Sequence, residues 1–366
     1  MSRRDIGTDD PRVHVRPGRG SRPRTKIRPD YSTARRGRVT AVDRGRYAVT
    51  MIDDATAVVA VKARELPRGS VAVGDVCAMV GDLSGRKDTL ARIAAVDERR
   101  TALRRTAEDG DAAGTERVIV ANADQMLIVA ALAQPEPKTG FIDRCLVAAY
   151  DAGLEPILVF TKADLAPSQP IVAQYAPLGL QIFATAMPVE SAQEPLGIAS
   201  VRAALSGHVS VFIGQSGVGK STLINALAPE AGRATGSVNA VTGKGRHTST
   251  SAMAFTLPSS GSSTPAPSAD ARGSAAPTST PNVCHSPTVV IDTPGVRGFG
   301  LAHVCADSLL HGFPDLLDIA RDCPRGCTHR AGEPECALAA VDSSALAARV
   351  QSYQRLLAAI DKPEWA

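Results

Sequence analysis

The sequence predicts an α/β nucleotide-binding domain that lies between a small all-β barrel and a C-terminal helical module. Three observations lead to this prediction: a phosphate-binding motif between a strand and a helix, a series of five short strands ahead of it, and a cluster of cysteine and histidine residues behind it. With 366 residues the chain is long enough for two or three domains. We place a basic, disordered tail at residues 1–36, the barrel at 37–104, the nucleotide-binding domain at 105–300 and the helical module at 301–366.

The barrel is predicted from five apolar runs that are separated by turns rich in Gly, Asp and Pro. These runs are residues 37–42, 46–51, 57–61, 76–80 and 91–96. Small barrels of this kind bind oligonucleotides on one face when they have the OB-fold arrangement. The spacing of the runs alone is equally compatible with an SH3-like barrel.

A strand that ends in a variant of the guanine-recognition box follows in the chain. The apolar run 155–160 leads into Thr161, Lys162, Ala163 and Asp164, where the usual box reads N-K-x-D. The Asp164 carboxylate can accept hydrogen bonds from N1–H and N2–H₂ of guanine, a donor pair that adenine lacks, and the Lys162 stem can cover the ring. Taken alone, this short motif is better explained by a solvated Lys/Asp pair at a strand end, and a phosphate-binding loop elsewhere in the chain is needed to reverse that interpretation.

The strongest motif begins at Gly214, directly after the apolar run 209–213. It completes the pattern G-x-x-x-x-G-K-[ST] in the strand–loop–helix context that a phosphate-binding loop (P-loop) requires. The alternative is a Gly-rich turn before an ordinary helix, which the complete pattern and its context disfavour. Glycines let backbone N–H groups converge on phosphate oxygens, Lys220 adds positive charge near the β- and γ-phosphates, and the Ser221 hydroxyl can ligate Mg²⁺. The predicted nucleotide contacts of this loop are Gly214, Gln215, Ser216, Gly217, Val218, Gly219, Lys220, Ser221 and Thr222.

A third box completes the set and reveals an unusual order. The run 288–291 is followed by Asp292, which can hold Mg²⁺ through water, and by Gly295, whose N–H can sense the γ-phosphate in a D-x-x-G box. In ordinary GTPases the P-loop comes first, then the D-x-x-G box, then the guanine box. Here the guanine box precedes the P-loop by about fifty residues. The sequence therefore predicts a circularly permuted α/β P-loop GTPase domain that binds GTP rather than ATP.

The C-terminal cluster has the composition of a zinc site. Cys323, Cys327, His329 and Cys336 form a Cys₃His set that can close a tetrahedral structural site and that leaves no open position for catalysis. A disulfide pair or scattered buried cysteines are the alternatives, and a cytosolic context disfavours disulfides. The apolar spacing of residues 343–360 predicts a helix beside this cluster. The other four cysteines are expected to be reduced and isolated: Cys77, Cys145, Cys284 and Cys305.

This combination resembles the bacterial ribosome small subunit-dependent GTPase family (RsgA, also called YjeQ or EngC) over residues 37–366. The resemblance extends to the stretches 121–125 (ANADQ) and 141–144 (FIDR), and to 184–186 (ATA), where the loop that contacts guanine O6 is expected. It implies an OB-fold for the barrel. The chain departs from the family in two places. Its cysteine cluster reads C-x₃-C-x-H-x₆-C instead of C-x₄-C-x-H-x₅-C. In the guanine box, Thr161 replaces the usual asparagine, whose side-chain amide connects the box to the P-loop.

The resemblance also implies a first switch and a catalytic residue. Residues 243–250 are similar to the family's G-x-G-x-H-T-T-T switch. A threonine of this switch is expected to close on Mg²⁺; we favour Thr250, with Thr248 as the alternative. Val296 stands where many GTPases carry a water-orienting glutamine, and the family is thought to use the switch histidine instead, which corresponds to His247. The alternative is that His247 is an ordinary loop histidine.

Charge and composition indicate where the protein works. The formal net charge is +4, but residues 1–36 hold eleven Lys or Arg against four Asp, which suits RNA phosphates or, alternatively, a merely solubilising extension. No apolar run reaches the length needed to span a bilayer, and no signal peptide precedes the barrel, so we expect a cytoplasmic protein. An insertion at about residues 257–286, rich in Ser, Pro, Ala and Thr, is expected to be disordered.

Together these observations predict a GTP hydrolase that binds the small (30S) ribosomal subunit and its 16S rRNA and assists late maturation, with hydrolysis timing its release. It would act as a monomer, with one Zn²⁺ per chain and with Mg²⁺ accompanying GTP. An RNA-binding switch with negligible turnover is one alternative. A permuted GTPase of the large subunit is another, but those relatives lack both the barrel and the Cys₃His cluster.

Overall fold

The computed structural model describes residues 30–106, 116–187, 195–228, 252–257, 287–293, 301, 304 and 306–360. The described residues from Ala34 onward form one compact unit. Several predicted features lie outside the described residues, namely most of the basic tail, the first switch, Gly295, Val296, the insertion, and the cysteines at 284 and 305.

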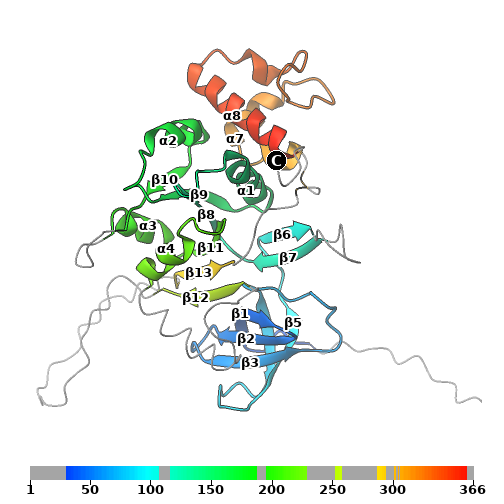
Figure 1. The fold of residues 1–366 in the computed structure, drawn as a ribbon. Coiled ribbons are helices and arrows are strands. Elements are labelled where there is room, and N and C mark those ends of the chain that lie inside the picture. The colour runs from blue at the N-terminus through cyan, green and yellow to red at the C-terminus, as the bar shows by residue number, and fades with distance from the viewer. Residues whose placement is uncertain are drawn as a thin grey trace, which may run out of the picture. The chain divides into compact units, whose positions relative to one another are not determined.

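The N-terminal strands close into a barrel (Figure 1). The strands are β1 (Arg36–Asp43), β2 (Arg46–Met51), β3 (Ala57–Lys62), β4 (Val76–Gly81) and β5 (Ala91–Val96). They pair in the order β1-β2-β3-β5-β4, and β4 pairs back onto β1. The β3–β5 pair is parallel and the other pairs are antiparallel, which is the OB-fold arrangement. Alternate residues point inward, so that Val39, Val49 and Ile93 are almost completely buried.

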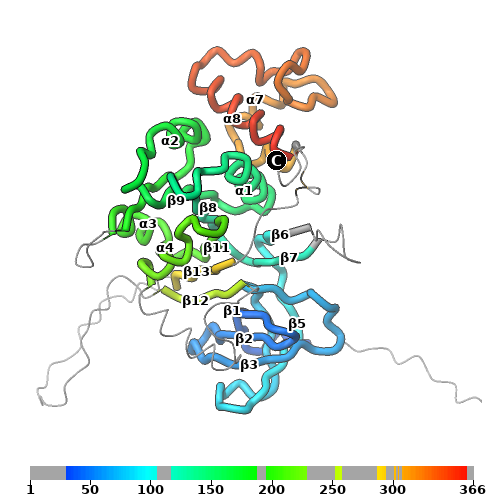
Figure 2. The backbone as a smooth tube through the Cα atoms, in the orientation of Figure 1, coloured from blue at the N-terminus to red at the C-terminus, as the bar shows by residue number. Residues whose placement is uncertain are grey.

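A two-stranded segment, β6 (Ala102–Thr106) with β7 (Glu116–Ala121), follows the barrel along the chain (Figure 2). The ANADQ stretch comes next, and its polar residues make structural contacts. Asn122 has a left-handed backbone (φ 55°), and its amide donates a hydrogen bond to the Gly74 carbonyl. The Asp124 carboxylate accepts a hydrogen bond from the Val209 N–H at 2.8 Å. This stretch therefore connects the start of the P-loop strand β11 to the barrel, through the Gly74 carbonyl that lies just ahead of β4.

The nucleotide-binding domain is built on a mostly parallel sheet. Its strands are β8 (Gln125–Ala131), β9 (Glu155–Thr161), β10 (Gln181–Ala184), β11 (Val209–Gly214), β12 (Met253–Thr256) and β13 (Val289–Asp292). Their order is β10-β9-β8-β11-β13-β12, and only β12 runs antiparallel to its neighbour in this part of the sheet. The P-loop strand β11 is therefore central, and the guanine-box strand β9 lies two positions away.

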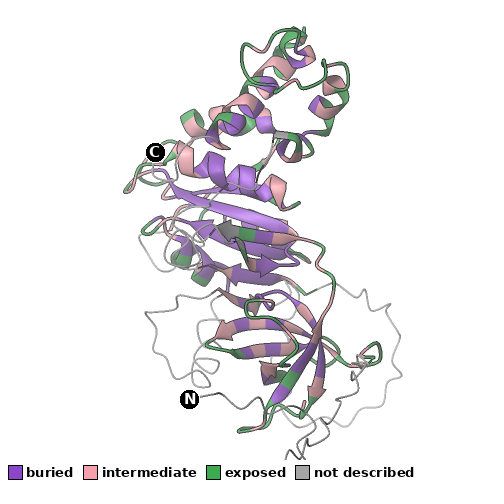
Figure 3. Cartoon of the chain, turned by 90° about the vertical axis from the view of Figure 1, so that its right-hand side faces the viewer, coloured by how far each residue is buried: buried purple, intermediate pink, exposed green. Residues whose placement is uncertain are grey.

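Helices cover both faces of this sheet, so its central strands are apolar on both sides and buried (Figure 3). The helices are α1 (Thr139–Asp151), α2 (Gln169–Tyr175) with the 3₁₀ turn η2 (Ala176–Leu178), α3 (Ile198–Leu205) and α4 (Lys220–Leu227). One face packs against α1 and the C-terminal helices, and the other packs against α3 and α4. Because ligands of such sheets bind outside the carboxyl ends of the strands, this edge positions the site.

The C-terminal part is helical, as predicted. It contains α6 (Ala306–Leu310), α7 (Pro314–Ala320), the 3₁₀ turn η3 (Ala337–Ala340) and α8 (Ser344–Ile360). The buried Phe313 ring lies 5.0 Å from the ring of Tyr150 on α1 and 5.3 Å from the ring of Tyr353 on α8, measured between centroids. These aromatic contacts join the C-terminal helices to the face of the sheet that α1 covers. Among the described helices, none combines the length and apolar character needed to cross a membrane.

Candidate nucleotide-binding site and metal centre

The P-loop lies between the end of β11 and the start of α4, as its sequence predicted. Gly217 and Gly219 have left-handed backbones, with φ of 80° and 88°, which a residue with a side chain adopts only with strain. Gly219 is the residue that precedes α4, so the first N–H groups of that helix face the loop. Ser221 and Thr222 lie exposed in its first turn. The local geometry is that of an anion-binding loop.

The P-loop lysine and the D-x-x-G aspartate meet at the same edge. Strands β11 and β13 are parallel neighbours, with Phe212 opposite Asp292. The Lys220 ammonium, on a residue that is only 9% exposed, forms an ion pair with the Asp292 carboxylate. Thr293 is buried, and its hydroxyl donates a hydrogen bond to the Phe212 carbonyl at 2.7 Å. Two predicted phosphate- and magnesium-binding groups are therefore adjacent.

Thr161 ties the guanine box to the P-loop. Its hydroxyl donates a hydrogen bond to the Val218 carbonyl at 2.5 Å, and the residue is 5% exposed. The threonine hydroxyl thus joins the same two segments that an asparagine amide normally joins. The sequence predicts that the Thr161 hydroxyl partly replaces the asparagine amide, and this hydrogen bond joins two residues that are 57 positions apart in the chain.

Lys162 makes a second tie, which includes a residue that the sequence did not indicate. Its ammonium donates to the Gly217 carbonyl at 3.0 Å and also to the carbonyl of Gln134. Gln134 lies in the segment 132–138, which we call the β8–α1 loop. No motif pointed to this loop, because its contribution is a backbone carbonyl. The lysine stem is thereby fixed beside the P-loop, where it can cover a base.

The rest of the guanine box contacts the predicted O6 loop. The Ala163 N–H donates to the Thr185 carbonyl at 3.1 Å, and the Thr185 N–H donates to the Phe160 carbonyl at 2.7 Å. Thr185 is 1% exposed, and these two backbone hydrogen bonds attach its loop to the end of β9 and to the guanine box. Asp164 is exposed and free to meet a ligand. The structure therefore brings the three segments expected to surround a guanine nucleotide to one edge of the sheet.

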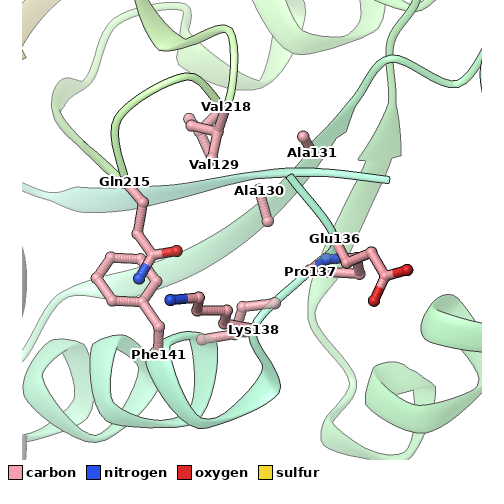
Figure 4. A pocket seen from close by; sticks show the side chains of 10 residues that line it. Val129, Ala130, Ala131, Glu136, Pro137, Lys138, Phe141, Gln215 and Val218 are labelled. Carbon is pink, nitrogen blue, oxygen red and sulfur yellow. The ribbon is translucent and has the colours of Figure 1, made fainter. Parts of the chain in front are cut away.

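A small pocket lies between the P-loop and the start of α1 (Figure 4). Gln215 lines it from the P-loop, Glu136 and Lys138 from the β8–α1 loop, and Phe141 from α1. Lys138 directly precedes α1, so the loop that binds Lys162 also sets where this helix begins. The beginning of α1 therefore forms part of the wall of a pocket beside the P-loop.

The cysteine cluster is assembled as a compact ligand set. The Nδ1 atom of His329 lies 3.4 Å from the sulfur of Cys327, 3.6 Å from that of Cys323 and 3.8 Å from that of Cys336. The Cys323 and Cys336 sulfurs are 4.0 Å apart. Burial, followed by hydrogen bonding to Cys327, raises the pKa of the Cys336 thiol to about 11. The four side chains could hold a metal ion.

The structure describes only some of the remaining residues that the sequence singled out. His247, Thr248, Thr250 and Gly295 lie outside the described residues. Cys77 and Cys145 are buried free thiols, as predicted. In the FIDR stretch, Asp143 and Arg144 are buried in α1.

Comparisons with known proteins identify relatives of this architecture. Residues 96–273 match the family model described as RsgA GTPase. A relative from Pseudomonas aeruginosa, named small ribosomal subunit biogenesis GTPase RsgA, is 36% identical over 264 residues, which are 70% of this chain and 68% of the relative.

Two solved structures are similar to this chain in fold. The crystal structure of YjeQ from Thermotoga maritima is 23% identical and matches with a TM-score of 0.57, covering 88% of this chain and 98% of that one. YloQ, described as a circularly permuted GTPase, is 20% identical and matches with a TM-score of 0.54, covering 90% and 96%. The permuted fold predicted from the order of the motifs is confirmed.

Proposed function

Because this chain belongs to the RsgA GTPase family, we propose that it hydrolyses GTP on the small (30S) ribosomal subunit, assists late maturation of that subunit and uses hydrolysis to time its own release. The observation that carries this proposal is the convergence of the guanine box, the P-loop and Asp292 at one edge of the sheet. The name of the Pseudomonas relative supports the ribosomal part.

The nucleotide contacts divide into base and phosphate recognition. Asp164 would accept hydrogen bonds from guanine N1–H and N2–H₂, beside the Lys162 stem. Lys220 is held by Asp292, and a bound γ-phosphate would compete for its ammonium. The Asp292 carboxylate would then be available to hold Mg²⁺ through water, and the Ser221 hydroxyl would ligate the ion. Nucleotide binding is thus expected to rearrange one ion pair rather than the fold.

The hydrolytic step needs a group that orients water. Val296 is aliphatic and cannot do so, and the resemblance of residues 243–250 to the family's switch assigns this role to His247. We assign the switch contact with Mg²⁺ to Thr250, with Thr248 as the alternative, and the γ-phosphate sensor to Gly295. All of these residues lie outside the described part of the chain, so their assignment rests on the sequence.

We assign zinc to the Cys₃His cluster. Zn–S bonds of about 2.3 Å and Zn–N bonds of about 2.0–2.1 Å in a tetrahedron place sulfur and nitrogen about 3.6 Å apart and two sulfurs about 3.8 Å apart. The observed separations of 3.4–3.8 Å and 4.0 Å fit these values. The Ala337 N–H also donates to the Cys323 sulfur at 3.3 Å, as is usual around metal thiolates. Four protein ligands make this a structural ion, one per chain.

The remaining parts would supply the ribosomal contacts. The OB-fold barrel and the C-terminal module would contact 16S rRNA, because OB-folds present a face to nucleic acid. The basic tail would add affinity through phosphate contacts without choosing the site. We further propose a cytoplasmic monomer, since ribosomal subunits are assembled in the cytoplasm.

The decisive test is GTP hydrolysis and cosedimentation with separated ribosomal subunits. Small subunits, but not large ones, are expected to retain the protein in the presence of a non-hydrolysable GTP analogue and to raise GTP turnover. The matched control is Lys220→Ala, which is expected to lose nucleotide-dependent binding. If small subunits retain the protein without raising turnover, it is an RNA-binding switch. If large subunits do both instead, the proposal is wrong.

A further inference from the structure

The C-terminal helix α8 lies against α1 and α2, which each follow a loop of the proposed nucleotide site. Helix α1 begins at Thr139, just after the β8–α1 loop whose Gln134 carbonyl binds Lys162. Helix α2 begins at Gln169, shortly after Asp164. The position of these two helices therefore affects the geometry of the guanine box, although neither carries a predicted nucleotide ligand.

One side chain of α8 contacts both helices. Arg355 pairs through Nε with the Asp143 carboxylate of α1 at 3.2 Å, where the Asp143 side chain is only 7% exposed. Its Nη1 donates to the Gln174 carbonyl of α2 at 3.4 Å, and its guanidinium lies 4.9 Å from the centroid of the Tyr175 ring. The Tyr175 hydroxyl reaches back to the Thr139 carbonyl at 3.4 Å, so the three elements form one contact set.

Other contacts hold α8 itself in place. The Arg144 side chain of α1 donates to the Ala359 carbonyl near the end of α8 at 3.2 Å. The Gln354 amide donates to the carbonyl of the metal-cluster residue His329 at 3.4 Å. Arg355 therefore projects from a helix that is attached both to α1 and to the cysteine cluster. From this fixed position its side chain can hold α1 and α2 in one relative orientation.

A partly buried ion pair of this kind, with the Arg355 side chain 30% exposed, adds little net stability, because solvent screening and desolvation both oppose the attraction of the charges. A planar guanidinium that is fixed by a carboxylate, a carbonyl and an aromatic ring does define geometry, and lysine cannot reproduce all three contacts. Preorganisation of a binding site matters directly, since an apparent dissociation constant rises in inverse proportion to the fraction of molecules in the competent conformation.

We propose that Arg355 is a positioning residue for guanine recognition: by holding α1 and α2 together, it keeps Lys162 and Asp164 in the arrangement that contacts the base. This inference rests on the proposed function, because it assumes that Asp164 reads guanine. It adds a residue of the C-terminal module, almost two hundred positions away in sequence, to the determinants of base selectivity.

The test compares equilibrium binding of GTP and inosine triphosphate to the full-length, metal-containing protein. Inosine lacks the 2-amino group, so the ratio of the two dissociation constants reports on the Asp164 contact. Arg355→Gln is expected to weaken GTP binding by at least about fivefold, the lower end of typical site-to-site coupling, and to affect inosine triphosphate less. Asp143→Asn is expected to act in the same direction, and Arg355→Lys is expected to recover part of the selectivity.

The matched control is Arg321→Gln, because Arg321 also lies in the C-terminal part but its side chain is 74% exposed and, among the described residues, its ion pair is with Asp318. This control is expected to bind both nucleotides like the native protein. If Arg355→Gln does not fold, Asp143→Asn and Arg355→Lys carry the same comparison.

The outcomes separate this inference from the proposed function. Equal losses of affinity for both nucleotides, or no loss for either, would show that Arg355 only supports the fold and would overturn the inference. Failure of the native protein to prefer GTP over ATP would instead overturn the assignment of Asp164, and with it the proposed guanine specificity.

Discussion

The hydrogen bond between Thr161 and the P-loop gives the sharpest prediction about the nucleotide site. Thr161→Val keeps the shape of the side chain but removes the donor to the Val218 carbonyl, which lies 2.5 Å from the hydroxyl. Within the described part of the chain, the other acceptor of this hydroxyl is the Ala130 carbonyl at 3.4 Å. A buried carbonyl that loses its donor costs about 1–3 kcal/mol. If that cost falls on the nucleotide-binding conformation of the loop, GTP affinity decreases about 5- to 150-fold.

The assay is equilibrium binding of a fluorescent GTP analogue to the native protein and three variants. Thr161→Ser keeps the donor and serves as the matched control, which is expected to bind within about threefold of the native protein because a side-chain hydroxyl still reaches the acceptor. Thr161→Asn restores the residue usual in the box and is expected to retain the tie. Native affinity in Thr161→Val, with an unchanged unfolding midpoint, would refute the idea that this bond organises the P-loop.

Four further predictions test other parts of the proposal. Asp164→Asn is expected to favour xanthosine over guanosine triphosphate in competition binding, because the amide donates where xanthine has an acceptor; an unchanged preference contradicts base reading by Asp164. His247→Ala is expected to spare GTP binding and lower turnover with small subunits present, whereas Lys220→Ala is expected to weaken binding; native turnover in the histidine variant removes it from catalysis. Purified protein is expected to contain one zinc by elemental analysis, and both chelation and Cys327→Ser are expected to unfold the C-terminal region without abolishing GTP binding. Deletion of residues 1–36 is expected to weaken small-subunit binding and flatten its salt dependence while subunit preference persists; loss of that preference contradicts the assigned role.

Parts of this protein are encoded in short, contiguous stretches, and these could be predicted from the sequence. The P-loop needs a strand, left-handed glycines and a helix start in immediate succession, so residues 209–228 define it locally. The barrel strands were predictable because one face is buried and apolar residues alternate along each strand, as in β1. The helix predicted over 343–360 is observed as α8, and the four cluster ligands lie within fourteen residues of one another.

The barrel type was not decided by strand spacing. The positions of the five strands fit two kinds of barrel, because alternation reports which side of a strand is buried but not which strand is its neighbour. The parallel β3–β5 pair and the closure of β1 on β4 distinguish the OB-fold, and both depend on pairing between strands far apart in the chain.

The motifs predict the chemistry of this chain from the sequence, because each motif places its functional groups on a few consecutive residues whose backbone conformation is set locally. The contacts that hold these groups in place depend on the packing of the folded chain. The carbonyl of Gln134 that binds Lys162, the tie from Thr161 to Val218 and the contact of Arg355 with Asp143 join residues 28, 57 and 212 positions apart. Such contacts arise from the packing of helices and strands on a sheet, and a backbone carbonyl or a lone arginine leaves no pattern in the sequence from which they could be inferred.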